Sequence, residues 1–236
     1  PMRTPQNDPR PGRNARPRLW QRAAALALTA LVLTATPGCI VAGLVGGMAE
    51  SAHRSGSTMY PAEYDGLTGK TYAVVVSADR LIEADHPGIA ARITQLVDTR
   101  LHEHAGASAH IPPARLISFL YANPQWQAVP RGELGEYLGV ERLILIELVD
   151  YRLHEPGNRY TYSGVASGIV QVFEVDSGLP DDPMYEQPIA VAFPDRAGIL
   201  EEEISKTAVT SELSRRFGER VAWLFYPHEE KNDLKY

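Results

Sequence analysis

The stretch ERLILIELVDYRL, residues 141–153, carries the strongest strand signal in the chain. Its first half is continuously apolar, which is typical of a central strand covered on both faces of a sheet. The turn-forming sequence EPGN follows at 155–158, and a second long strand pattern runs over 159–175. We therefore predict a sheet built around these two strands.

Three further apolar stretches predict strands at 71–78, 114–120 and 188–193. In the long strand after the turn, Gly164 and Gly168 are expected to allow close packing or a bend, since glycine has no side chain to fill that space.

Helical patterns separate the strands. Asp85 is expected to cap a helix that ends near Gly106. A short helix is predicted over 131–138, with Gly139 as its stop, and a longer one over 201–226. The apolar stripe of this last helix comprises Val209, Leu213, Phe217, Val221 and Leu224.

The resulting order, β-α-β-α-β-β-β-α, predicts an α+β fold in which helices pack on a mixed sheet. We expect a single domain. The predicted organisation is a signal peptide (1–38), a glycine-rich tether that begins with a lipidated cysteine (39–65), a mixed α/β body (66–228) and a polar tail (229–236).

The signal prediction rests on a basic amino terminus followed by an uncharged apolar run at 23–35. The sequence TATPGC then ends at Cys39, the only cysteine of the chain, so an internal disulfide is excluded. The site resembles a bacterial lipobox, in which Gly38 fits the position before the lipidated cysteine, whereas Thr36 and Pro37 depart from the usual pattern. An uncleaved signal anchor, or cleavage elsewhere, remains an alternative.

An acylated Cys39 would hold the protein on a membrane. In the common Gram-negative sorting rule, aspartate after the cysteine retains a lipoprotein at the inner membrane. This chain has Ile40 there, so the resemblance implies the outer membrane, with the body facing the periplasm.

The charge is distributed unevenly. Residues 39–236 hold 17 Lys and Arg against 28 Asp and Glu, a net charge of −11. Nucleic-acid binding needs clustered basic side chains, and the body shows no such cluster, so we expect no nucleic-acid partner.

Motifs for catalysis, metals or cofactors are lacking, so we predict a protein that is not an enzyme. His102 and His104 fall at the end of the predicted helix, where residues two apart point in different directions. A hydrolase that uses His102, His104 or Asp85 remains an alternative, and it requires a cleft that gathers these groups.

Aromatic residues suggest a contact surface. Tyrosine and tryptophan concentrate at protein interfaces, although aromatic residues near a hairpin also form cross-strand packing pairs. Exposed and coplanar tyrosines would instead favour a glycan-binding module. The predicted surface for a partner comprises Tyr121, Trp126, Tyr151, Tyr160 and Tyr162.

Three segments carry a family resemblance: GKTYAVVVSA, ELGEYLGVERLILIELVDYRL and GVASGIVQVFEVDSG, all between residues 66 and 225. Together they resemble a group of exported bacterial proteins that includes CsgG, PelC, LpoB and the amino-terminal domain of TolB. The resemblance implies a non-enzymatic accessory or assembly subunit in envelope secretion, polysaccharide export or cell-wall synthesis. It also implies a protein partner in the envelope and allows a homo-oligomeric ring.

Overall fold

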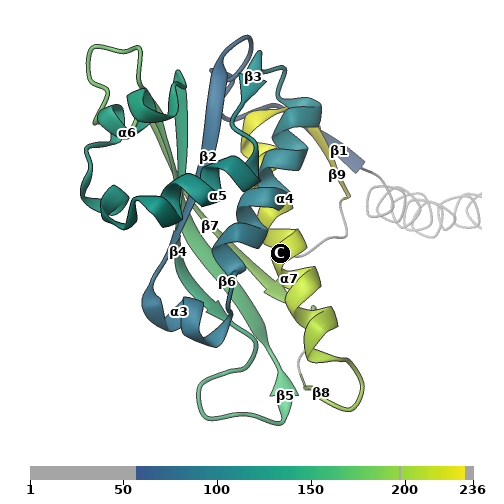
Figure 1. Ribbon diagram of the computed structural model, residues 1–236. Helices are drawn as coiled ribbons and strands as arrows, with labels where there is room; N and C mark the ends of the chain where they lie inside the picture. The colour runs from purple at the N-terminus through teal and green to yellow at the C-terminus, as the bar shows by residue number, and fades with distance from the viewer. Residues whose placement is uncertain (1–56, 197, 232–236) are drawn as a thin grey trace, which may run out of the picture. The chain divides into compact units, whose positions relative to one another are not determined.

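The computed structural model describes residues 57–196 and 198–231, which belong to one compact α+β unit. Its centre is a five-stranded mixed sheet (Figure 1) in the order β3-β2-β4-β6-β7. The neighbours β3, β2 and β4 are parallel, whereas β6 and β7 are antiparallel to their neighbours. The strands are β2 (Thr71–Ala78), β3 (Ala109–His110), β4 (Arg142–Arg152), β6 (Gly164–Glu174) and β7 (Tyr185–Phe193). The predicted fold class is confirmed.

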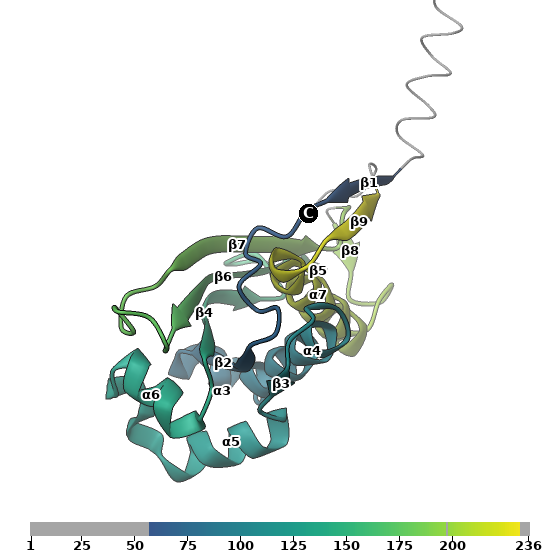
Figure 2. The ribbon, with the colours of Figure 1, turned by 90° about the horizontal axis from the view of Figure 1, so that it is seen from above.

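Two long helices cover one face of this sheet. Helix α4 (Ile89–His104) and helix α7 (Lys206–Ala222) lie side by side against it (Figure 2). A 3-10 turn, η2 (Trp223–Phe225), follows α7. All five residues of the predicted stripe are buried, so the apolar face of α7 is confirmed.

Shorter helices cover part of the other face. Helix α5 (Pro113–Ala122), the 3-10 helix η1 (Pro124–Ala128) and helix α6 (Arg131–Leu138) form a second core against β2 and β4. Helix α6 has the predicted bounds, and Gly139 ends it with a φ of 68°, a conformation that favours glycine.

The strand predicted at 114–120 is wrong, because these residues form α5. The apolar run is compatible with either period, and Pro113 occupies the first turn of the helix, where its missing N–H is harmless. The strand that precedes α5 is the two-residue β3, so the edge row of the sheet is much shorter than the sequence predicts.

The predicted helix cap at Asp85 is also wrong. Asp85 ends a separate short helix, α3 (Arg80–Asp85), which is capped by Asp79. Helix α4 begins after Gly88, which has no side chain for capping. The Glu83 carboxylate instead accepts hydrogen bonds from the backbone N–H groups of Gly88 (3.1 Å) and Ala90 (3.2 Å).

Residues expected in the tether and the tail form part of the fold. Strand β1 (Ser57–Tyr60) pairs antiparallel with β9 (His228–Lys231), and Ser57 lies opposite Lys231. Just after β1, the backbone N–H groups of Glu63 and Tyr64 both donate to the Leu224 carbonyl at 2.9 Å. A second small pair joins β5 (Thr161–Tyr162) to β8 (Ile199–Leu200).

The glycines of β6 allow close packing, as predicted. A Cβ at Gly168 would lie 2.6 Å from the Glu147 carbonyl oxygen and 3.2 Å from the Phe217 ring. At Gly164 it would lie 2.6 Å from the Phe193 carbonyl oxygen. Real Cβ atoms do not approach a backbone oxygen so closely. The close packing of α7 and the neighbouring strands against β6 therefore requires glycine at both positions.

Candidate functional site

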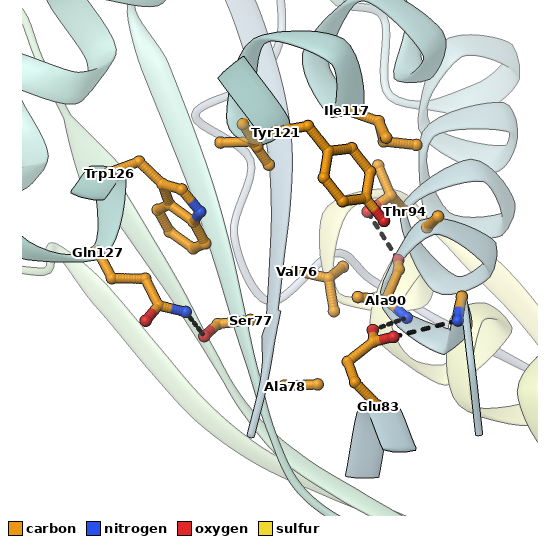
Figure 3. A pocket seen from close by; sticks show the side chains of 13 residues that line it. Val76, Ser77, Ala78, Glu83, Ala90, Thr94, Ile117, Tyr121, Trp126 and Gln127 are labelled. Atoms are coloured by element: carbon orange, nitrogen blue, oxygen red, sulfur yellow. Dashed lines mark hydrogen bonds between the residues drawn. The ribbon is translucent and has the colours of Figure 1, made fainter. Parts of the chain in front are cut away.

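An apolar hollow bounded by several elements lies at the carboxyl end of β2. It has a volume of about 360 Å³ and is bounded by β2, α3, α4, α5 and η1. Figure 3 shows Tyr121, Trp126 and Glu83 around Val76 near the end of the strand. In sheets with parallel strands, ligands bind outside the carboxyl ends of those strands. We call this hollow the β2 pocket.

Two of the predicted contact residues line the β2 pocket. Tyr121 is in the last turn of α5 and is 80% exposed, whereas Trp126 in η1 is only 9% exposed. The side-chain amide of Asn123, at the end of α5, donates to the Phe119 carbonyl at 2.8 Å. This bond fixes the turn between Tyr121 and Trp126. The site therefore combines a free phenol ring with an indole held in the second core.

Polar groups in the pocket are mostly engaged with each other. The Gln127 amide donates to the Ser77 hydroxyl at 3.3 Å, and the Thr94 hydroxyl donates to the Ala90 carbonyl at 2.9 Å. Glu83 is the only charged residue of the lining, and its carboxylate caps α4. The pocket is thus suited to apolar side chains and offers no cation to an acidic ligand.

The other predicted contact residues do not join this surface. Tyr151 and Tyr162 are only 4% and 3% exposed. Both belong to the main core, which lies between the sheet and helices α4 and α7. Tyr160, in contrast, is 81% exposed in the loop before β5. The Tyr151 hydroxyl lies 2.8 Å from the Ser214 hydroxyl and donates to the Thr210 carbonyl at 3.1 Å. Burial therefore removes Tyr151 and Tyr162 from the predicted surface, and with them the glycan platform of three coplanar rings.

A bulge explains why Tyr151 points inward. The β4–β6 register shifts between Leu148 and Asp150, so one extra residue, Val149, stands in β4. Before the shift, Ile146 and Leu148 face the main core; after it, Tyr151 does. A bulge of this kind moves the following side chains to the opposite faces.

The groups of the hydrolase alternative are not gathered in one cleft. His102 stacks on His110 with 4.5 Å between ring centroids, and His104 packs on Tyr226. Asp85 lies before the start of α4, and His102 near the end of this 16-residue helix. A rise of about 1.5 Å per residue separates the two ends of α4 by more than about 20 Å. His110 Nδ1 also lies 2.8 Å from the buried Asp98 carboxylate, a contact that no local sequence pattern indicates.

A second hollow, of about 280 Å³, lies between the end of α3 and the start of α7. Its lining mixes the acidic Asp85 with the basic Lys206 and Arg152. The His86 ring packs edge-on against Tyr151 at 4.8 Å. Burial, followed by the positive charge of Lys206, lowers the pKa of His86 below its ordinary value.

The described part of the chain, residues 57–196 and 198–231, contains no group of three or more His, Cys, Asp or Glu arranged to hold a metal ion. It also contains no helix that is both long and apolar enough to cross a membrane. The predicted signal peptide and the lipid attachment at Cys39 lie outside the described residues.

No protein-family model matches the sequence, and no curated protein matches it. Similar solved structures include a PelC dodecamer from Paraburkholderia phytofirmans, with 11% identity and a TM-score of 0.40 over 72% of this chain and 98% of that chain. A lipoprotein from Neisseria meningitidis has 12% identity and a TM-score of 0.42, covering 64% of this chain and 97% of that chain. Likeness at this level supports no transfer of function.

Proposed function

We propose that this chain is a non-enzymatic lipoprotein of the bacterial envelope, anchored through Cys39 to the outer membrane. In this proposal the body faces the periplasm and acts as an accessory or assembly subunit by binding another protein. The order of basic segment, apolar run and Cys39 supports the anchor.

The β2 pocket is the observation that carries the binding role. It places an exposed tyrosine, Tyr121, beside an apolar hollow that is large enough for one or two side chains. Aromatic anchors beside desolvated pockets dominate the binding energy of protein interfaces. The lining has no paired nucleophile and base, so the geometry favours recognition over catalysis.

Membrane fractionation tests the anchor. The full chain should stay with the membranes, whereas Cys39→Ser should move to the soluble periplasmic fraction with its body still folded. Globomycin, which blocks processing of bacterial lipoproteins, should cause the unprocessed form to accumulate. Finding the wild-type body free in the periplasm would contradict the anchor.

Photo-crosslinking in the native cells tests the contact. A benzoylphenylalanine at position 121 should yield a defined crosslinked protein, identified by mass spectrometry. The same substitution at Tyr160 is a matched control, because Tyr160 is equally exposed but lies outside the β2 pocket. Equal crosslinking at both positions would contradict a specific contact at Tyr121.

A further inference from the structure

The edge strand beside β2 is so short that most of β2 has no strand partner on that side among the described residues. The backbone N–H groups of Ser108 and Ile111 donate to the carbonyls of Lys70 (2.9 Å) and Tyr72 (3.0 Å). The β2–β3 pairing ends at Tyr72, although β2 continues to Ala78. Six residues of β2 therefore have a strand partner on the β4 side alone among the described residues.

The direction of the unused backbone groups follows from this pairing. Successive residues of a strand direct their N–H and C=O groups to opposite sides. Because the Tyr72 carbonyl is bonded on the β3 side, the backbone groups of Val76 and Ala78 point to that side too. Within the described residues, neither forms a hydrogen bond there.

These groups open into the β2 pocket. Val76 and Ala78 are part of its lining (Figure 3). Val76 is also buried. Buried backbone donors and acceptors are almost always paired, because an unpaired one loses its hydration without compensation. A strand edge with free N–H and C=O groups is also the template to which extended peptides add.

We propose that the β2 pocket is a strand-addition site for an extended segment of a partner protein. The segment pairs with the edge of β2 at Val76 and Ala78, and inserts an apolar side chain beside Tyr121 and Trp126. This assignment deepens the proposed function and rests on it.

The negative charge of the pocket lining and of the body limits which partner segments can bind. Glu83 is the only charged residue of the lining, and the described residues hold 15 Lys and Arg against 26 Asp and Glu, a net charge of −11. An acidic segment would meet repulsion on approach, whereas flanking Lys or Arg is attracted. The occupant is therefore an uncharged or basic stretch that carries a large apolar side chain.

A random dodecapeptide library displayed on phage, selected against the full chain in detergent, supplies the probe. Enriched peptides should share an apolar residue and lack Asp and Glu. Ala91→Trp, which fills the pocket from α4, should weaken their binding at least tenfold. Ala114→Trp, at an exposed position of α5 outside the pocket, is the matched control and should leave it unchanged.

Two measurements on the best peptide test backbone pairing. Its binding should slow hydrogen exchange at the amides of Val76 and Ala78. N-methylation of one peptide amide should lower the affinity at least tenfold, while N-methylation of the next amide along should not. Lack of enrichment, equal binding to Ala91→Trp, or binding without both signatures overturns strand addition.

A remaining occupant is the chain's own apolar segment 40–49. In that case the Val76 and Ala78 amides are protected before any peptide is added, and deletion of 40–49 exposes them; this result also overturns the proposal. Crosslinking at Tyr121 in cells, without a backbone signature, would leave the proposed function standing and remove strand addition alone. If neither the crosslink at Tyr121 nor the backbone signature is observed, both the proposed function and strand addition are rejected.

Discussion

Tyr121 and Trp126 are five residues apart and line the same pocket, yet one ring is almost fully exposed and the other almost fully buried. Tyr121 belongs to the end of α5, whereas Trp126 packs in the second core with Leu116 and Leu134. At this one site, Trp126 therefore belongs to the stabilising core, whereas Tyr121 is the exposed residue to which we assign the proposed partner contact.

Truncation should show this division directly. Trp126→Ala should lower the free energy of unfolding by about 3 kcal/mol, because it leaves a cavity in the second core. Tyr121→Ala should change it by less than about 0.5 kcal/mol, as is usual for exposed positions. Urea unfolding followed by circular dichroism measures both, and a large loss of stability for Tyr121→Ala would contradict the assignment.

The close packing around Gly168 predicts that even an alanine at this position destabilises the fold. Gly168→Ala should lower the free energy of unfolding by about 1–3 kcal/mol, since the new methyl group meets the Glu147 carbonyl and Phe217. Gly178→Ala is the control, because a Cβ at Gly178 has no atom within 4 Å. Thermal unfolding of both variants would test this, and equal melting temperatures would argue against the crowding.

The lowered pKa of His86 predicts a pH effect. Burial and then Lys206 lower this pKa, so below about pH 6.5 the unfolded chain binds a proton that the folded chain does not. The stability that neutral His86 contributes is complete above pH 6.5 and is lost as the pH falls through the folded pKa. His86→Gln should flatten this part of the stability curve measured by urea unfolding from pH 7.5 to pH 5. An unchanged slope would assign the effect to other groups.

The lowered pKa of Glu212 predicts a second loss of stability, at lower pH. Its bond to Arg215 at 2.8 Å, opposed by burial and aided by Arg216, lowers the pKa of this carboxyl to about 2. Its contribution to stability is therefore complete above the ordinary pKa of 4.5 and is lost as the pH falls toward 2.

Glu212→Gln should consequently lower the free energy of unfolding by about 1 kcal/mol at pH 7. The difference from wild type should shrink steadily below about pH 4.5. Urea unfolding, which adds no salt to screen the charges, gives the three comparisons at pH 7, 4.5 and 3. A difference that stays constant to pH 3 would contradict the ion pair. Glu202→Gln, on an exposed residue of the preceding loop, is a suitable control.

Local signals allowed the core of the fold to be predicted. The continuous apolar first half of β4, the glycine stop at Gly139 and the stripe of α7 each depend on residues close in sequence. The segment 114–120 was misassigned because a short apolar run does not distinguish helix from strand. Pro113, a residue favoured in the first turn of helices, was the available correction.

The site was only partly predictable, because it depends on contacts between distant segments. Tyr121 and Trp126 were identified as aromatic residues, but the small residues that leave the hollow open, Ala90 and Ala91, carry no signal alone. The burial of Tyr151 could have been found. The core-facing apolar residues alternate up to Leu148, but the next one, Tyr151, comes three residues later instead of two. This break in the alternation indicates the bulge.

The pairing of β1 with β9 has a consequence for protein engineering. Ser57 and Lys231 are opposite each other, so a few added residues are enough to join them into a continuous backbone. New termini can then be opened in the exposed turn at Gly157, between β4 and β5. Such a circular permutant would retain the five-stranded sheet while changing the point at which a fusion partner or a surface support is attached.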